Sequence, residues 1–389
     1  MANPLDRRFP SVDDLEAAAR DRVPKFVFDY IVCGMGARND DPGSGVRRNR
    51  QALSDVRLLP RYLDDPGAID PSVTLFGQKY SAAFGVAPVG SGGAVWPGAA
   101  ETLAAEAKRR NQPFAASSMA VSSLESLREH AGDCGWFQFY RPNDPDIEED
   151  MIARAETAGY KVMVVTVDVP GPLRRNQDLR NGFTADFSIA DPRTVLSIMR
   201  HPAWAFGFLK SGYPSIASFD PYGPRSGPTK ERTAFIRNIV TGHVTAQILE
   251  RLRARWRGPM LVKGILDPAE AKRCQDIGID GIVVSNHGGR QSEAAPATAE
   301  VLPAIRQAVG NNYPLVADGG VRSGLDICRM LALGADLVLL GRAFYLAMGA
   351  MGPAGAAHVF DILTDELTGA MRQIGAKTPI ALRNHLHHP

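Results

Sequence analysis

The sequence has little that points to a disulfide scaffold, a membrane span or a charged partner. Its four cysteines lie far apart and form no CxxC pair, which excludes the spacing of a zinc ribbon and predicts reduced, buried thiols at Cys33, Cys134, Cys274 and Cys328. No apolar run approaches the roughly 18 residues of a membrane-spanning helix. The formal net charge is only +2, from 44 Lys+Arg and 42 Asp+Glu, so no global field favours nucleic acid. We therefore expect a small-molecule function with no nucleic-acid partner and no bound metal.

The two ends of the sequence carry few signals. The N-terminal segment is charged throughout and lacks an apolar core followed by a small-residue cleavage site, so we expect a cytoplasmic protein. His385, His387 and His388 are expected to lie in a short solvated tail. With 389 residues and 44% hydrophobic content, length alone leaves the domain count open.

The first 80 residues predict a cap of helices and a small strand layer. Residues 11–33 have helical periodicity with Ser11 as N-cap, and Pro24 is expected to break or kink that helix. Residues 39–45 are rich in Gly, Asp and Pro, which is typical of a loop. Residues 56–80 have the short, turn-punctuated pattern of a few strands.

From residue 83 to 376, short apolar runs alternate with helical stretches in eight units. Apolar strands covered by helices on both sides imply a parallel sheet, and eight units predict closure into an α/β (β/α)₈ TIM barrel. The alternative, an open doubly wound sheet, is disfavoured because no GxGxxG follows the first strand. We expect one domain over residues 1–389. The eight runs are AFGVAPV, PFAAS, WFQFY, VMVVTVD, PMLVK, GIVVSN, PLVAD and DLVLLG.

Residues 172–257 follow the fourth barrel strand and are too long for a simple connection. We expect them to form an insert with helices of its own. Within this insert, the segment 194–210 mixes Trp204, Phe206 and Phe208 with basic residues. That composition occurs in lids packed on a barrel mouth and also in segments that lie on a membrane surface, so both interpretations stay open.

Polar residues close most of the apolar runs, at the end of the barrel where the active sites of this fold gather. A single one could be an ordinary strand-end group, but their occurrence at successive strands favours a site. These residues are Gln138, Tyr140, Thr166, Asp168, Lys263, Ser285, Asn286, His287, Asp318, Gly341 and Arg342.

The motifs ADGGVRSG and LLGR follow the seventh and eighth strands, where barrels commonly hold a phosphate. Gly319, Gly320 and Gly341 would let backbone N–H groups approach phosphate oxygens. Arg322 and Arg342 would add charge-assisted hydrogen bonds. The pattern predicts a phosphorylated cofactor or substrate, and the alternative is that the glycines only form tight turns.

The segment GIVVSNHGGRQ places His287 and Arg290 three residues apart on a glycine-rich loop after the sixth strand. Histidine is suited to proton transfer near neutral pH, and arginine can hold a carboxylate through two parallel hydrogen bonds. Asp168 is a candidate partner that would orient the imidazole, stabilise its protonated form and raise its pKa. The sequence therefore predicts a base and a carboxylate-binding cation side by side.

Together these motifs resemble the FMN-dependent (S)-2-hydroxy-acid oxidases and dehydrogenases, the family of glycolate oxidase, the L-lactate dehydrogenase of respiring bacteria and mandelate dehydrogenase. The resemblance runs from about residue 9 to 376 and rests on VSNHGGRQ, TVD followed by Arg175, LVKGI, DGGVR and LGRAF, in that order. It implies an FMN-binding barrel that oxidises a small (S)-2-hydroxy acid to the 2-oxo acid. It also implies that the protein assembles as a homo-oligomer, namely a tetramer.

Position by position, the resemblance implies three sets of residues. The substrate is bound by Tyr30, Arg175, Arg290 and Tyr140, of which Tyr140 contacts the hydroxyl oxygen. The groups implied in catalysis are His287 as the base, Asp168 as its partner, Tyr140, and Lys263 near the flavin. The residues implied to bind FMN are Ala87, Pro88, Val89, Ser117, Gln138, Thr166, Lys263, Ser285, Asp318, Gly319, Gly320, Arg322, Gly341 and Arg342.

One departure from the common family pattern concerns the electron acceptor, and one further resemblance concerns the location. Gly90 stands where many oxidases have alanine, and glycine is more typical of the quinone-reducing dehydrogenases, so we expect quinone or another acceptor. The alternative is an oxidase that produces hydrogen peroxide from oxygen. HPAWAF in the insert is similar to the bacterial lactate and mandelate dehydrogenases, whose insert contacts the membrane, so the protein is expected in the cytoplasm or on the inner face of the cell membrane.

Two other classes of function remain as alternatives to a flavin enzyme. One is a barrel isomerase or lyase of a sugar phosphate, in which Lys263 forms a Schiff base and the protein is colourless. The other is a catalytically silent scaffold, which predicts the loss of one of the catalytic groups.

Overall fold

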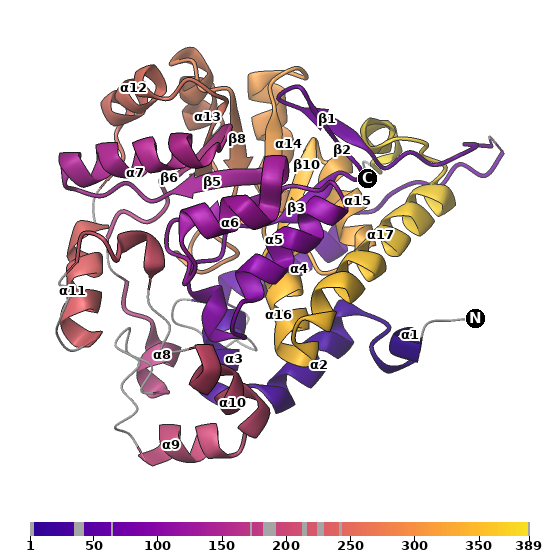
Figure 1. The fold of residues 1–389 in the computed structure, drawn as a ribbon. Coiled ribbons are helices and arrows are strands. Elements are labelled where there is room, and N and C mark those ends of the chain that lie inside the picture. Colours follow the sequence, from indigo (N-terminus) through magenta and orange to yellow (C-terminus); the bar gives the residue numbers. More distant parts are fainter. Residues whose placement is uncertain are drawn as a thin grey trace.

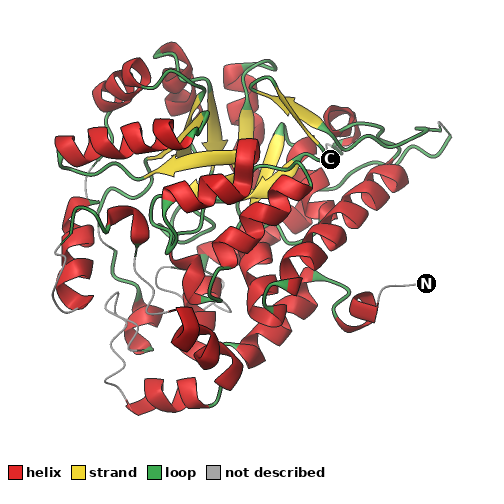
Figure 2. Cartoon of the chain, viewed as in Figure 1, coloured by secondary structure: helices red, strands yellow, loops and turns green. Residues whose placement is uncertain are grey.

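A closed barrel of eight parallel strands forms the centre of the molecule, which confirms the predicted (β/α)₈ architecture. The computed structural model describes residues 4–34, 43–63, 65–171, 173–181, 192–211, 216–223, 229–240 and 243–387. The strand order around the barrel is β10-β3-β4-β5-β6-β7-β8-β9, so strands adjacent in sequence are adjacent in space. Figures 1 and 2 show these strands inside a layer of helices.

Each of the eight predicted apolar runs forms one barrel strand. The strands are β3 (Phe84–Val86), β4 (Phe114–Ser117), β5 (Gly135–Phe139), β6 (Val162–Thr166), β7 (Met260–Ile265), β8 (Gly281–Val284), β9 (Leu315–Asp318) and β10 (Leu337–Leu340). The covering helices are α5 (Ala99–Arg109), α6 (Leu124–Ala131), α7 (Pro145–Ala158), α12 (Ala246–Arg255), α13 (Pro268–Asp276), α14 (Thr298–Val309), α15 (Gly324–Ala332), α16 (Arg342–Met351) and α17 (Ala354–Ile374). Short 3-10 helices occur at η1 (Ser91–Ala94) and η2 (Gly132–Cys134).

A two-stranded hairpin, β1 (Val73–Leu75) and β2 (Gln78–Tyr80), covers the amino end of the barrel. Trp136, the second residue of β5, donates a hydrogen bond from Nε1 to the hydroxyl of Tyr80 at 2.9 Å, and both side chains are buried. The strand layer predicted for residues 56–80 is therefore correct only for its last part. Between residues 56 and 72 the described residues contain a single isolated bridge, from Leu58 to Leu386.

The N-terminal residues form helices that pack against the C-terminal half of the barrel. After α1 (Pro4–Arg8), the predicted helix of residues 11–33 is broken at Pro24 as expected, into α2 (Val12–Arg22) and α3 (Lys25–Val32). Ser11 caps α2, accepting a hydrogen bond from the Asp14 amide at 3.3 Å. A further helix, α4 (Gly45–Asp55), was not predicted, because only three of its residues are buried in an otherwise polar sequence.

The insert after β6 contains helices, as predicted. The described ones are α8 (Asn176–Arg180), α9 (Pro192–Met199), α10 (Pro202–Ser211), η3 (Ala217–Phe219) and α11 (Thr229–Ile239). The last part of residues 172–257 forms α12, a covering helix of the barrel, and some other parts lie outside the described residues. Trp204 anchors α10: its ring packs edge-on against Phe26 of α3 at 6.0 Å between centroids, and its Nε1 donates to the Ala94 carbonyl at 3.1 Å. The segment 194–210 is thus tied to the N-terminal cap.

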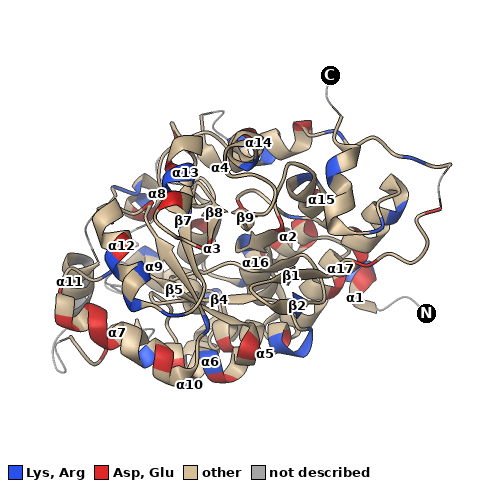
Figure 3. Cartoon of the chain, turned by 90° about the horizontal axis from the view of Figure 1, so that it is seen from above, with Lys and Arg blue, Asp and Glu red and all other residues tan. Residues whose placement is uncertain are grey.

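Acidic and basic residues alternate along the helices (Figure 3), in keeping with the small net charge. All four cysteines are buried and unpaired. Within the described residues, no helix combines the length and apolar character needed to cross a bilayer. The solvated tail expected at the C-terminus is wrong for His385, which lies at the end of η4 (Pro379–His385), is buried, and has Nδ1 2.9 Å from the Leu59 carbonyl.

Candidate active site

Six buried polar side chains form a continuous row at the carboxyl ends of the barrel strands. Gln138 of β5 donates from Nε2 to Thr166 Oγ1 of β6 at 2.9 Å. Lys263 of β7 donates to Ser285 Oγ at 2.9 Å, and Ser285 in turn donates to Asp318 Oδ1 at 2.6 Å. The sixth, Ser117, lies beside Gln138 in the β4–β5 register. Because parallel strands present their carboxyl ends at one rim, residues far apart in sequence meet here as predicted.

His287 and Asp168 lie in direct contact above this row. The Nδ1 atom of His287 is 3.0 Å from Asp168 Oδ1, and its Nε2 is 3.4 Å from the hydroxyl of Tyr140. The His287 backbone has φ of +56°, an uncommon conformation for a residue with a side chain, and its amide donates to Ser285 Oγ at 3.0 Å. The imidazole is therefore held at both ring nitrogens.

Gly264 makes room for the Asp168 carboxylate. The pairing of β7 with β8 shifts register between Lys263 and Ile265, and Gly264 has φ of +109°. A Cβ atom at this position would lie 2.5 Å from the Cβ of Asp168. This bulge lets the carboxylate pack against the strand, and the sequence reasoning did not single out Gly264.

The charges of this cluster set its proton affinities. Burial lowers the pKa of His287, and although the Asp168 carboxylate raises it as expected, burial outweighs this contribution and the net shift is downward. Burial alone would raise the pKa of Asp168, but His287 and Lys263 outweigh it and the net pKa is lowered. At neutral pH the pair is thus a neutral imidazole beside a carboxylate, which leaves Nε2 able to accept a proton.

Lys263 stays protonated in spite of its burial. Burial lowers its pKa, but Asp318, whose Oδ2 lies 3.4 Å from Nζ, and Asp168 outweigh that effect and raise the pKa overall. A lysine that forms a Schiff base needs a neutral amine. The ion pair of Lys263 with Asp318 therefore does not favour the sugar-phosphate isomerase or lyase alternative, in which Lys263 forms a Schiff base.

A row of positive charge runs from the insert to the loops after β9 and β10. It consists of four arginines, namely Arg175, Arg290, Arg342 and Arg322. Burial and then the charge of Arg175 lower the pKa of Arg290 to about 10, and burial with the charges of Arg290 and Arg322 lowers the pKa of Arg342. Buried like charges repel one another unless anions lie between them. The row suits two anions, a carboxylate at the Arg175–Arg290 end and a phosphate at the Arg342–Arg322 end.

Arg290 and Arg342 also bind the C-terminal end of α3. Arg290 Nη1 donates to the carbonyls of Tyr30, Ile31 and Cys33 at 2.7 to 3.0 Å, and its guanidinium lies 5.1 Å from the centre of the Tyr30 ring. Arg342 Nε donates to the Ile31 carbonyl at 2.9 Å. Cations at a helix C-terminus satisfy its last carbonyls and favour its dipole. Nothing in the sequence indicates this second set of contacts for either arginine.

The predicted phosphate loops have the backbone that such a site requires. Gly319 and Gly320 both have positive φ, and a Cβ atom on Gly320 would lie 2.9 Å from the Asn49 backbone. Gly341 caps the N-terminus of α16, where orphan amides favour an anion. Arg322 is held by Glu16, 3.8 Å from its Nε, and it also lines a hollow of about 380 Å³ between α2, α4 and α15.

Two asparagines link these loops, namely Asn286, one of the predicted strand-end residues, and Asn49, which carries no signal of its own in the sequence. Asn49 of α4 and Asn286 exchange two hydrogen bonds of 2.8 Å between their side-chain amides, and both are buried. Asn286 Oδ1 also accepts from the Gly289 amide at 3.0 Å. The pair thus holds the loop that carries His287 against the N-terminal cap. Asn49 could have been noted only through its helical spacing from the buried Leu53.

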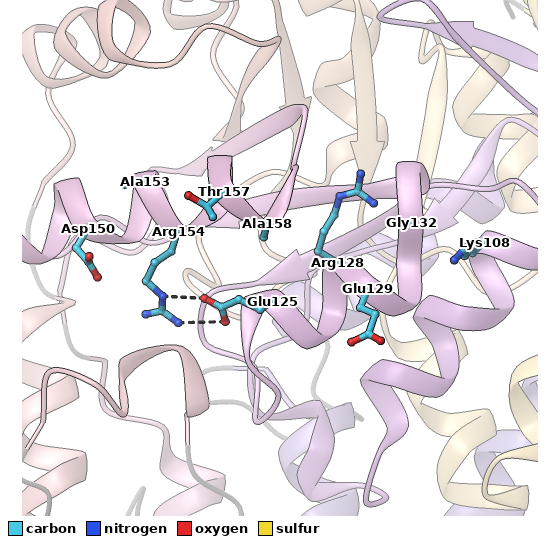
Figure 4. Close-up of a pocket in the computed structure, with 10 residues that line it drawn as sticks. All are labelled: Lys108, Glu125, Arg128, Glu129, Gly132, Asp150, Ala153, Arg154, Thr157 and Ala158. Atoms are coloured by element: carbon cyan, nitrogen blue, oxygen red, sulfur yellow. Dashed lines mark hydrogen bonds and ion pairs between the residues drawn. The ribbon is translucent and has the colours of Figure 1, made fainter.

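A larger hollow, of about 720 Å³, lies on the outside of the barrel and is not the site. Ten residues of α5, α6 and α7 and the turn after α6 line it, and in Figure 4 Glu125 and Arg154 face each other across it as an ion pair. None of the predicted site residues lines this hollow.

The closed barrel carries a buried proton-accepting pair and a row of arginines at its carboxyl end, an arrangement that suits an enzyme with a phosphorylated cofactor. The family described as FMN-dependent dehydrogenase matches residues 19–388, and the chain belongs to this family. L-lactate dehydrogenases of Caulobacter vibrioides and Xanthobacter autotrophicus are 37% and 38% identical over 369 residues, covering 94% of this chain and 94% and 93% of the relatives.

Solved structures agree with the family assignment. The structure described as monotopic membrane protein (S)-mandelate dehydrogenase has a TM-score of 0.90 and 32% identity, covering 97% of this chain and 99% of that one. Mandelate oxidase has a TM-score of 0.81 and 31% identity, covering 97% and 98%. The predicted family, fold class and FMN cofactor are thereby confirmed. The silent-scaffold alternative loses its support, because every catalytic group expected is present.

The site residues fit an FMN. Among the described residues, Gln138 Oε1 is a buried acceptor without a hydrogen-bond partner, as suits a ring N–H of a flavin. The arginine row and the glycine loops supply the phosphate end, and the protonated Lys263 suits negative charge on the reduced ring.

Proposed function

We propose that the protein oxidises an (S)-2-hydroxy acid, lactate-like or mandelate-like, to the 2-oxo acid, with His287 as the base. The observation that carries this proposal is the contact between His287 and Asp168 at the carboxyl end of the barrel, beside Tyr140 and the arginine row. The names of the relatives, L-lactate dehydrogenase and mandelate dehydrogenase, support the same substrate class.

His287 would accept the hydroxyl proton of the substrate at Nε2. Its lowered pKa keeps Nε2 unprotonated before the reaction, and the Asp168 carboxylate at Nδ1 stabilises the imidazolium that forms. Tyr140, whose own pKa is raised by burial and by Asp168, stays protonated and can donate a hydrogen bond to the substrate oxygen. Bound FMN supplies the acceptor for the α-hydrogen and two electrons, which no side chain can provide.

Arg175, Arg290 and Tyr30 would bind the substrate carboxylate. Arg175 and Arg290 are the pair at the insert end of the charge row, and the Tyr30 ring stacks under the Arg290 guanidinium. An anion between the two arginines would relieve the repulsion that depresses the pKa of Arg290. The substrate would then lie with its hydroxyl toward His287.

The residues that would hold FMN are those of the strand-end row and the phosphate loops. They are Ala87, Pro88, Val89, Ser117, Gln138, Thr166, Lys263, Ser285, Asp318, Gly319, Gly320, Arg322, Gly341 and Arg342.

For the electron acceptor we propose a quinone rather than oxygen. Gly90 supports this assignment, because a Cβ atom there would lie 3.2 Å from both the Cβ and the carbonyl oxygen of Met119, so the alanine typical of oxidases would crowd this loop. The alternative is an oxidase that forms hydrogen peroxide.

One experiment tests the substrate class and the acceptor together. The purified protein should be yellow, and its flavin should bleach under anaerobic conditions with one or more members of a panel of glycolate, lactate, mandelate and longer 2-hydroxy acids. Readmission of air should reoxidise it slowly and a soluble quinone quickly. A colourless folded protein, or a flavin that no acid in the panel bleaches, would contradict the function, and rapid peroxide formation would favour the oxidase.

We also propose a peripheral contact with the inner face of the cell membrane through α9 and α10. Five large apolar side chains are exposed on this pair of helices, namely Val195, Leu196, Met199, Phe206 and Leu209. Basic residues in the same segment suit anionic lipid headgroups. The double variant Phe206→Ser with Leu209→Ser should lose flotation with anionic vesicles, whereas Ile380→Ser, an exposed apolar position outside the insert, should not. Equal flotation of both variants would contradict the proposal.

A homo-oligomer, a tetramer by family resemblance, is proposed as the assembled state. The segment between α4 and β1 projects from the body of the molecule (Figure 1), and its Leu63 side chain is fully exposed at 102%. An apolar side chain presented in this way suits burial against another subunit. Light scattering should give an oligomeric mass that falls for Leu63→Ser, and a monomeric wild-type protein would contradict the assignment.

A further inference from the structure

The helix α3 holds the first segment of the insert through a single carboxylate. Asp29 Oδ2 accepts hydrogen bonds from Gln177 Nε2 and Asn181 Nδ2, both at 2.9 Å, and forms an ion pair with Lys25 one turn earlier. Asp29 is only 8% exposed, so these contacts are shielded from water. Hydrogen bonds to a charged acceptor are stronger than neutral ones.

The segment that Asp29 holds is α8, which begins directly after Arg175. A helix of five residues cannot be stable by itself, so tertiary contacts must fix its position. Arg175 lies close enough to the site for its charge to act on the pKa values of Tyr140, Arg290 and Asp178. The place of the Arg175 guanidinium therefore depends on how α8 is held.

The same helix presents a different group to the site. Tyr30 follows Asp29, and consecutive residues of a helix point about 100° apart, so one faces the Arg290 guanidinium while the other faces α8. A third residue of this helix, Phe26, packs against Trp204 of α10. Because α3 contacts the insert at two places, it sets the distance between Tyr30 and the residues of the insert.

We propose that Asp29 is a positioning residue that holds Arg175 over the substrate carboxylate by anchoring α8 through Gln177 and Asn181. Asp29 does not touch the substrate in this proposal. The inference rests on the proposed function, in which Arg175 binds the carboxylate. Loss of the anchor should release α8 and weaken binding of carboxylate ligands, with little change in the steps that His287 performs.

The test compares holoenzyme variants that remove the anchor with one that does not. Asp29→Ala and the double variant Gln177→Ala with Asn181→Ala should each raise KM for the hydroxy acid and the dissociation constant of oxalate about tenfold, with kcat within about threefold. Lys25→Met, which removes the ion pair of an exposed lysine but leaves both amide donors, should behave as wild type. Oxalate binding is read from the flavin absorption spectrum and needs no turnover.

Asp29→Asn separates positioning from a direct effect of charge. Asparagine keeps a side-chain oxygen for the two amide donors but loses the negative charge that strengthens these bonds, so its KM should lie between the values of the wild type and Asp29→Ala. If Asp29→Asn and Asp29→Ala are equally impaired, charge rather than the anchor is responsible and the proposal is overturned.

Amide hydrogen exchange keeps the anchor testable whatever the substrate proves to be. Exchange in residues 176–181 should accelerate in Asp29→Ala and stay unchanged in Lys25→Met, at equal flavin content. Unchanged exchange in Asp29→Ala would overturn the proposal even for an active enzyme. Faster exchange without any effect on oxalate binding would overturn the link to Arg175, whereas failure of the wild-type flavin to bleach with any hydroxy acid would count against the proposed function instead.

Discussion

Replacement of Asp168 by asparagine tests the central pair of the site most directly. Asp168 Oδ1 lies 3.0 Å from His287 Nδ1, and asparagine keeps an oxygen that can accept the same hydrogen bond. What the substitution removes is the negative charge that stabilises the imidazolium formed when the substrate hydroxyl loses its proton. The geometry of the resting site should therefore survive while the chemical step slows.

The size of the effect follows from the burial of the pair. The side chains of His287 and Asp168 are 19% and 12% exposed, so little water reaches the charges. Removing one partner of a buried ion pair costs about 3–5 kcal/mol. The lower value applies here because the hydrogen bond is kept. A barrier raised by about 3 kcal/mol corresponds to roughly 10²-fold slower flavin reduction.

The assay is the rate of flavin bleaching in an anaerobic single turnover at saturating substrate, with flavin content as the control for folding. A reduction rate within about threefold of wild type would refute the argument that the Asp168 charge supports proton transfer. A protein without flavin would show instead that the residue is needed for assembly of the site.

The pH dependence of the same variant has a definite sign. The base must be unprotonated, so kcat/KM should fall as the pH drops through the pKa of His287, which lies below its ordinary value of 6.5. Asp168 raises that pKa against the larger effect of burial, so Asp168→Asn should move the acid limb to lower pH. A limb that moves to higher pH would contradict the assigned electrostatics.

Four further substitutions have defined outcomes. His287→Ala should slow flavin reduction about 10³-fold while keeping the flavin, and near-normal turnover would remove its role as base. Arg290→Met should raise KM for the hydroxy acid at least about tenfold, and an unchanged KM would count against carboxylate binding. Lys263→Met should lower the flavin reduction potential, measured by redox titration, and a potential equal to wild type would contradict the placing of its charge. Tyr80→Phe should lower the free energy of unfolding, measured by chemical denaturation, by about 1–3 kcal/mol, because Trp136 Nε1 loses its acceptor. Its kcat should be unchanged, because this contact lies at the other end of the barrel. An unchanged stability would show that the indole finds another partner.

The barrel could be predicted from sequence because its signal is local and strong. Each strand is a continuous apolar run, which is the pattern of a strand that is buried on both faces. The helix α4 was missed for the opposite reason, because its arginine-rich sequence has only three buried positions. The helix α8 lies in the insert that was expected to be helical, but at five residues it is too short to be located by periodicity. In both, tertiary contacts rather than local periodicity fix the helix.

The site residues at strand ends were predictable because the fold places them at one rim. The contacts of Arg290 with the α3 carbonyls were not, since they join residues about 260 positions apart that carry no mutual signal in sequence. The net direction of the His287 pKa shift could not be predicted either, because burial outweighs the effect of Asp168 and only the packed structure reveals that burial.

The buried amide pair of Asn49 and Asn286 has a consequence for how the chain reaches its native state. The two residues are 237 positions apart, and the buried Asn49 amide would lose both of these hydrogen bonds without Asn286. During synthesis α4, which carries Asn49, emerges long before Asn286 has been made. It therefore stays exposed to solvent until most of the barrel has left the ribosome. Folding of the cap should accordingly be a late event, and its helices should be the last to gain protection in a refolding experiment.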